Sequence, residues 1–249
     1  MIDFFFPSCY AQAMSRVPRI VAVGEPHHIT QPGNNYQDIF FVDEDREMYL
    51  EFLRDYSARN RFQIHAYCLM PNHIHIVGVP EKEDSMAKAI GHAHFRYSQY
   101  INRRHERSGH LWQGRFQSCT LDGAYYGEAL RFVEQNPIRA KLVKRAMDYP
   151  WSSAGVHCGA EPNDGLLDLR QWQELLSKGR TWKMMLRKAT TPEFQEALCL
   201  KTRTGRPLCS ENFLVALEKT LKRRIRPLPV GRPRGSKAKK TVKARKAKK

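Results

Sequence analysis

The sequence predicts a mixed α and β domain built on an antiparallel hairpin, followed by a small helical appendage and a basic tail. Two period-two apolar segments, residues 62–69 and 73–80, are joined by a turn-forming Met-Pro-Asn sequence. Apolar residues at three- and four-residue spacing predict amphipathic helices on both sides of this hairpin. The last twenty-eight of the 249 residues hold fourteen Lys and Arg and no acid, so they carry most of the net charge of +17.

The elements expected before the hairpin are two short strands and a helix. Apolar and β-branched residues predict strands over residues 20–23 and 28–30, and a Pro- and Gly-containing loop follows. Asp43 is a typical helix cap, and the apolar spacing predicts a helix from there to Arg59. Residues 1–13 share no pattern with the rest, so translation starting at Met14 is a hypothesis.

The hairpin carries a candidate metal site. In its second strand, His73 and His75 flank Ile74, and alternate side chains of a strand share a face. The two imidazoles would lie about 6–7 Å apart along the chain, close enough to bind one cation. The alternative is that both are ordinary core or surface histidines. The first strand is expected to place four side chains on one face: Phe62, Ile64, Ala66 and Cys68.

A second His-x-His sequence tests this interpretation. His92 and His94 have the same spacing, but they lie within residues 85–102, where apolar periodicity predicts a helix after a Ser85 cap. Side chains two residues apart on a helix point away from each other. The pattern therefore indicates a metal site at residues 73–75 and not at residues 92–94.

A basic loop and a further helix follow. Aromatic, amide and arginine side chains gather before and within residues 109–116, a composition suited to stacking bases and binding phosphates, although enzyme turns can look similar. Residues 116–121 predict a strand, and Asp122 is the expected cap of a helix over residues 123–136. The candidate DNA contacts in this region are Arg103, Arg104, Trp112, Gln113 and Arg115.

The helix over residues 123–136 is expected to complete the metal site. Asn136 lies four residues after Phe132, and Tyr125 lies seven before Phe132, so the three share roughly one face. A helix packed across the sheet would bring Asn136 to the histidines as a third, oxygen ligand.

Composition limits the classes of protein and the compartment. A hydrophobic fraction of 41% is enough for a core, and no apolar run approaches the roughly 18–20 residues that span a bilayer, so no membrane partner is expected. The six cysteines form no C-x-x-C pair, which argues against a zinc ribbon or a disulfide framework and favours a cytoplasmic protein.

Shifts in composition divide the chain into four predicted parts: residues 1–13, a domain over 14–158, a helical appendage over 159–221 and a tail over 222–249. The tail suits an anionic polymer, bound with strong salt dependence. Its Gly-Arg-Pro sequence resembles an AT-hook, in which Arg232 and Arg234 would enter a DNA minor groove. The tail therefore indicates contact with nucleic acid.

Four ordered motifs, residues 67–75, 109–116, 131–140 and 149–153, carry a family resemblance. With them, residues 14–157 resemble the REP-associated tyrosine transposases, relatives of the single-tyrosine IS200-like transposases with a His-hydrophobe-His (HUH) strand. The resemblance implies an α+β fold with an antiparallel β-sheet and packed helices. It also implies DNA transposition on single-stranded or hairpin DNA with Mg or Mn, and it makes Arg139 of the third motif a candidate DNA contact.

The implied mechanism requires a tyrosine at a position where this chain has a phenylalanine. In the family, a divalent cation polarises the scissile phosphate while a tyrosine attacks it, and the resemblance implies that His73, His75 and Asn136 would hold that cation here. That tyrosine is expected at the position of Phe132, which has no oxygen. Tyr125 and Tyr126 are possible displaced nucleophiles, although Tyr125 is about 10 Å away along the helix.

Three hypotheses follow from the missing tyrosine. The protein is a strand-cleaving and joining transposase with a displaced tyrosine, or a DNA-binding protein that has lost the covalent step, or a nuclease that hydrolyses DNA with a metal-activated water. A monomer and a homodimer both remain open.

Overall fold

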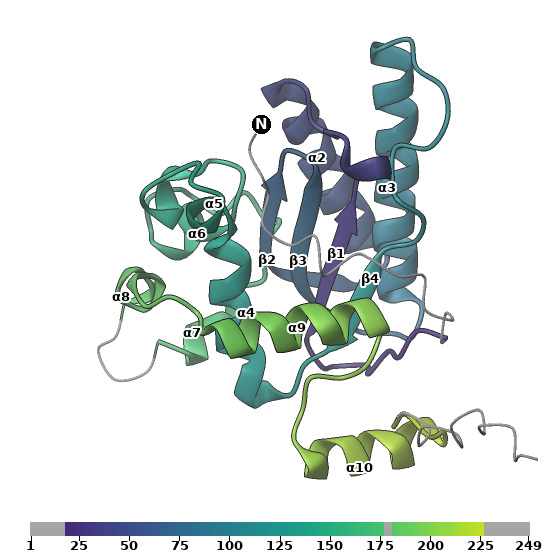
Figure 1. The fold of residues 1–249 in the computed structure, drawn as a ribbon, viewed down its shortest axis with the longest axis vertical. Helices are drawn as coiled ribbons and strands as arrows, with labels where there is room; N and C mark the ends of the chain where they lie inside the picture. The colour runs from purple at the N-terminus through teal and green to yellow at the C-terminus, as the bar shows by residue number, and fades with distance from the viewer. Residues whose placement is uncertain (1–17, 177–180, 227–249) are drawn as a thin grey trace, which may run out of the picture.

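A computed structural model of the protein describes residues 18–176 and 181–226. Within these residues, a four-stranded antiparallel sheet in the order β2-β3-β1-β4 forms the centre of the fold (Figure 1). Its strands are β1 (His27–Pro32), β2 (Phe62–Met70), β3 (His73–Pro80) and β4 (Gln117–Thr120). The expected α+β class with an antiparallel sheet and packed helices is confirmed.

The hairpin of β2 and β3 is present, but its first strand contains a β-bulge. Pairing shifts between Ile64 and Ala66, so His65 is the extra residue. A one-residue bulge reverses the alternation beyond it. Ile64 therefore packs in one core, and Ala66 and Cys68 pack in the core on the opposite face. The expectation that Phe62, Ile64, Ala66 and Cys68 share one face of the sheet is wrong, because the alternation of the sequence does not reveal the bulge.

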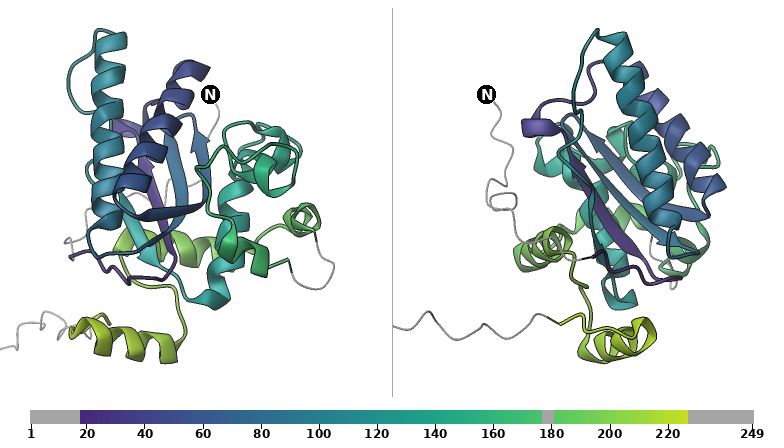
Figure 2. Two further views of the ribbon diagram at one scale, coloured as in Figure 1. Left: turned by 180° about the vertical axis from the view of Figure 1, so that it is seen from behind. Right: turned by 90° about the vertical axis from the view of Figure 1, so that its right-hand side faces the viewer.

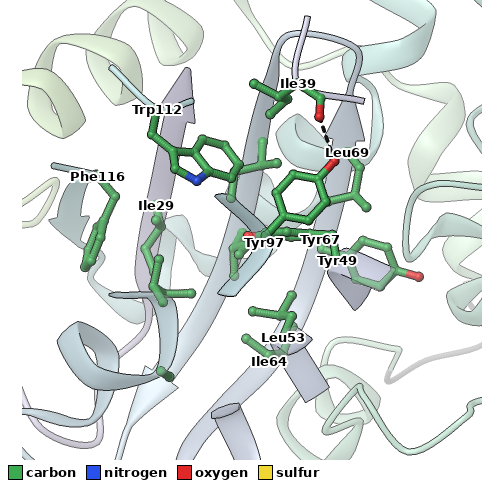
Figure 3. Packing of buried hydrophobic residues seen from close by; sticks show 14 of the residues in the cluster. Ile29, Ile39, Tyr49, Leu53, Ile64, Tyr67, Leu69, Tyr97, Trp112 and Phe116 are labelled. Carbon is green, nitrogen blue, oxygen red and sulfur yellow. Dashed lines mark hydrogen bonds between the residues drawn. The ribbon is translucent and has the colours of Figure 1, made fainter. Parts of the chain in front are cut away.

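One face of the sheet is covered by α2 (Asp43–Arg59) and α3 (Ser85–Arg104), as Figure 2 shows. Tyr97 of α3 packs in the core between these helices and the sheet, and its hydroxyl donates a 2.6 Å hydrogen bond to the carbonyl of Ile39 (Figure 3). At the start of α2, the carboxylate of Asp45, rather than the expected Asp43, accepts bonds from the Phe41 and Val42 amides.

The other face is covered by α4 (Gly123–Glu134), the short α5 (Asn136–Arg139) and α9 (Pro192–Thr204) (Figure 1). Asp122 caps α4 as expected, since its side chain accepts a bond from the amide of Ala124. The predicted single helix over residues 123–136 ends at Glu134, and Asn136 begins the next short helix. Asn136 is thus the first residue of α5 and not part of α4.

A buried carboxylate links α4 to later parts of the chain. Glu134 accepts hydrogen bonds from Ser153, His157 and, at 2.6 Å, the indole nitrogen of Trp182. The predicted domain boundaries remain predictions. The other helical segments are η1 (Asn34–Tyr36), η2 (Ala146–Asp148), α6 (Ala154–His157), α7 (Arg170–Glu174), α8 (Trp182–Arg187) and α10 (Glu211–Leu221).

Residues 20–23 do not form the expected strand. Ile20 and Ala22 instead pack with Leu217 and Ile225 in a small cluster under α10, so their apolar character serves a helix contact. No helix in the described part of the chain is long and apolar enough to cross a membrane. The predictions for residues 1–13, Arg232 and Arg234 lie outside the described residues.

Candidate metal and nucleic-acid site

Strand β3 presents two histidines to the face covered by α4 and α9. Ile74 and Ile76 point into the core beneath α2 and α3, and alternation turns His73 and His75 the other way. The ring centroids of the two histidines are 5.0 Å apart. In contrast, His92 contacts Tyr56, while His94 is buried against Trp112.

A third histidine, which the sequence patterns did not single out, adjoins this pair. His28 of β1 lies opposite Val77, two residues from His75 in the strand register, so the two are diagonal neighbours. Their rings stack with centroids 5.2 Å apart, and Nε2 of His28 lies 3.0 Å from Nδ1 of His75. The available signal was His28 itself, which begins the predicted strand over residues 28–30 directly after His27.

Hydrogen bonds occupy one nitrogen of each β3 histidine. Nδ1 of His73 lies 2.7 Å from Oδ1 of Asn72, whose Nδ2 donates to the Tyr36 carbonyl. The Asn72 oxygen therefore accepts, and His73 carries its hydrogen on Nδ1. Its Nε2 keeps a free lone pair, as a metal ligand requires. His75 likewise uses Nδ1 in the contact with His28.

The histidines of the site are held neutral. Burial, and secondarily the Arg139 guanidinium, lowers the pKa of His73 to about 4 and that of His28 to about 3. Burial, with His73, His28 and Arg139 nearby, holds the pKa of His75 well below its usual value. At neutral pH these imidazoles therefore have the uncharged form that binds metals.

Phe132 of α4 lies directly against the histidines. Its ring meets His28 and His75 edge-on, with centroid distances of 5.8 and 5.7 Å, and it is 2% exposed. The Arg139 guanidinium lies 4.2 Å from the centroid of the Phe132 ring and donates a 2.6 Å bond to the Phe132 carbonyl. A ring without an oxygen thus occupies the position expected for the family tyrosine.

The two tyrosines proposed as substitutes make other contacts. The hydroxyl of Tyr126 is buried and lies 2.8 Å from Nδ1 of His65. The ring of Tyr125 stacks on Phe194 of α9. Their roles as displaced nucleophiles remain predictions.

Asn136 and Arg139 supply polar atoms beside Phe132. The amide nitrogen of Asn136 donates to the carbonyls of Phe132 and Val133, and these bonds leave its Oδ1 unused. Nη1 of Arg139 is buried and has no hydrogen-bond partner in the described part of the chain. Burial lowers the pKa of Arg139 to about 10, so its guanidinium stays charged at neutral pH.

The chemistry of three atoms on this face suits a divalent cation of the kind that binds mixed nitrogen and oxygen ligands. Nε2 of His73, Nε2 of His75 and Oδ1 of Asn136 are the candidate donors, and a neutral amide oxygen suits Mg or Mn. Among residues 18–176 and 181–226, no group of three or more His, Cys, Asp and Glu side chains forms a metal site. The candidate set includes an amide and thus falls outside that class.

The predicted DNA contacts of the basic loop differ in exposure. Trp112 is 8% exposed, stacks on His94 and donates its indole hydrogen to the His94 carbonyl, so it belongs to the core. Gln113 accepts a bond from the Asn35 amide. Arg104 lies 2.9 Å from the Tyr100 hydroxyl and near Glu44, while Arg103 and Arg115 are exposed. Contact of these residues with DNA remains a prediction.

Comparison with known proteins agrees with this arrangement. Residues 26–136 match the model of the family described as "Transposase IS200 like". Over these residues, the chain is similar to the IS200-like transposases. The matched segment runs from before β1 to the first residue of α5, so it contains His28, His73, His75, Phe132 and Asn136.

Two solved structures are similar to this chain. One is a REP-associated tyrosine transposase bound to a REP hairpin, with 19% identity, a TM-score of 0.51, and coverage of 63% of this chain and 90% of that chain. A protein of Deinococcus radiodurans R1 provisionally assigned as a transposase has 19% identity, a TM-score of 0.33, and coverage of 50% and 96%. No curated protein matches the chain.

Proposed function

We propose that this protein acts as an IS200-like transposase relative that binds single-stranded or hairpin DNA and holds a phosphate of that DNA at His73, His75 and Asn136 together with Mg or Mn. The match to the IS200-like transposase family supports DNA as the partner, and the similar structure bound to a REP hairpin supports a folded single strand. When bound, such a cation polarises a phosphodiester and stabilises the charge that develops on it.

Arg139 is the proposed contact to the same phosphate. Its guanidinium is charged and lies on the Phe132 ring, and its buried Nη1 lacks a partner among the described residues. An unpaired buried donor is costly unless a ligand satisfies it. A guanidinium forms strong, charge-assisted hydrogen bonds with phosphate oxygens.

The observation that carries the proposal is the position of Phe132 against His28 and His75. Strand cleavage and joining through a phosphotyrosine needs a hydroxyl at this position, and phenylalanine has none. The hydroxyl of Tyr126 is engaged by His65, and Tyr125 stacks on α9. We therefore propose a DNA-binding protein that keeps the cation and phosphate contacts without the tyrosine step.

Two enzymatic candidates stand beside this function. Cleavage and joining in DNA transposition would require α4 to move so that Tyr125 or Tyr126 reaches the phosphate. Hydrolysis would require a water activated by a cation at the histidines, and the unprotonated Nε2 of His73 is available as a ligand of that cation.

One experiment separates the three. The full chain is incubated with an end-labelled DNA hairpin and Mn²⁺, and denaturing electrophoresis then resolves covalent adduct, nicked product and intact DNA. The proposed function predicts intact DNA on the denaturing gel and a protein–DNA complex when the same mixture is run on a native gel. An adduct lost in Tyr125→Phe or Tyr126→Phe would establish the displaced tyrosine, and free nicked product without adduct would establish hydrolysis. A His73→Ala, His75→Ala protein is the control for contaminating nuclease.

The remaining expectations concern the tail, assembly and location. Arg232 and Arg234 are proposed to add a second DNA contact, so deleting residues 227–249 should reduce the slope of log affinity against log salt concentration. The protein is proposed to be cytoplasmic. A monomer and a homodimer both remain compatible with the site.

A further inference from the structure

Helix α9 reaches the histidine face through one threonine. Oγ1 of Thr202 lies 2.8 Å from Nδ1 of His28, although the two residues are 174 positions apart. Nε2 of His28 lies 3.0 Å from Nδ1 of His75. A continuous chain of hydrogen bonds thus connects α9, β1 and β3, and all three side chains are buried. Thr202 lies outside the residues that match the transposase family.

Thr202, at the α9 end, determines which atom donates in each of these hydrogen bonds. The Thr202 hydroxyl donates a 2.7 Å bond to the carbonyl of Leu198, which can only accept. Having used its one hydrogen, Oγ1 of Thr202 accepts from Nδ1 of His28. The neighbouring Cys119 thiol lies 3.2 Å from the same oxygen, and burial raises its pKa to about 12, so the thiol keeps its hydrogen and donates it.

The same direction continues to His75. A neutral imidazole has one N–H, and His28 uses it toward Thr202, so its Nε2 accepts. The hydrogen between the rings therefore belongs to Nδ1 of His75, and Nε2 of His75 carries a lone pair. If the hydrogen bonds were donated in the opposite direction, His75 would carry its hydrogen on Nε2 and would be unable to bind a cation through that atom.

We propose that Thr202 and His28 are positioning residues that hold His75 in the Nδ1–H form and present its Nε2 to a divalent cation. The inference rests on the proposed cation site for its purpose. Its structural part, the position of the hydrogen on His75, is independent of any cation. Partners of this kind orient a ligating histidine and change metal affinity by roughly ten- to a hundredfold.

The first test measures the hydrogen positions directly. The full chain is labelled with ¹⁵N-histidine, and two-bond ¹H–¹⁵N spectra without metal report which ring nitrogen is protonated. We expect the Nδ1–H form for both His28 and His75. Detection of the Nε2–H form of His75 in the wild-type protein would overturn the inference, and this result requires no variant to fold.

The second test uses three matched variants. Thr202→Val keeps the shape and removes the hydroxyl, so it should release His75 into a mixture of forms and weaken Mn²⁺ binding, measured by EPR titration, by about tenfold or more. Thr202→Ser restores the hydroxyl and should restore both readouts. Cys119→Ala removes only the neighbouring thiol and should change neither.

The outcomes separate the inference from the proposed function. If the wild-type protein binds no Mn²⁺ but shows the Nδ1–H form, the cation site fails and the hydrogen-bond chain stands. If it binds Mn²⁺ and Thr202→Val changes neither affinity nor the hydrogen position, the inference fails and the cation site stands.

Discussion

Phe132 packs edge-on against His75, with ring centroids 5.7 Å apart and planes at 89°. The ring that would carry the nucleophile is therefore in place beside the histidine face, and its hydroxyl is missing. The Arg139 guanidinium lies 4.2 Å from the centroid of the same ring. A substitution that adds the hydroxyl to this ring therefore tests whether the rest of the proposed site can act.

Phe132→Tyr is expected to create strand nicking with a covalent protein–DNA adduct, because it adds a hydroxyl to a ring already at the histidine face. The measurement is denaturing electrophoresis of an end-labelled DNA hairpin incubated with Mn²⁺. Phe132→Leu is the matched control and should form no adduct. An inert Phe132→Tyr protein that still binds the hairpin would show that more than the nucleophile has been lost.

Arg139→Met is expected to weaken hairpin binding by about tenfold and to lower the salt slope by about one, because it removes one charged phosphate contact. Fluorescence anisotropy across a range of salt concentrations measures both. Arg145→Met is the control, since Arg145 is exposed and forms a two-bond pair with Asp148. Equal effects of the two variants would argue against a specific phosphate contact at Arg139.

Glu134→Gln is expected to lower the free energy of unfolding by roughly 3 kcal/mol, because an amide cannot accept from all three of its buried donors. These donors are on Ser153, His157 and Trp182. Urea unfolding measures the change. Glu128→Gln, which loses only a partly exposed pair with Arg131, should change it by less than about 1 kcal/mol.

Acid is expected to destabilise the fold through buried neutral histidines. Burial lowers the pKa of His94 from 6.5 to about 3, so between these values the unfolded chain binds a proton that the folded chain does not. Stability should therefore fall as pH decreases below about 6.5, by about 1.4 kcal/mol per pH unit for each such histidine.

Urea unfolding at several pH values between 4 and 7 measures this dependence. His94→Phe keeps a ring on Trp112 and removes the titrating group. The slope of the free energy of unfolding against pH should therefore decrease by the contribution of one proton, about 1.4 kcal/mol per pH unit. An unchanged slope in this variant would show that His94 is not a source of the acid sensitivity.

Local sequence patterns were sufficient to predict the hairpin, the helices α2 and α3 and the capped start of α4. The period of two in residues 73–80 and the spacing of three and four in the helices depend only on near neighbours in the chain. The four motifs were sufficient to recognise the resemblance to the IS200-like transposases. The same reasoning failed at residues 20–23, whose apolar side chains pack under α10, and at His65, whose bulge reverses the face of the strand.

By itself, the sequence determined that His73 and His75 share a face and that Phe132 stands where a tyrosine is expected. Only the tertiary structure decided which residues surround them. His28 joins His75 through strand register, and Thr202 joins His28 across 174 positions. Periodicity specifies the face on which a side chain lies, whereas cross-strand register and helix packing specify its neighbours. The hydrogen positions on the site histidines depend on those neighbours.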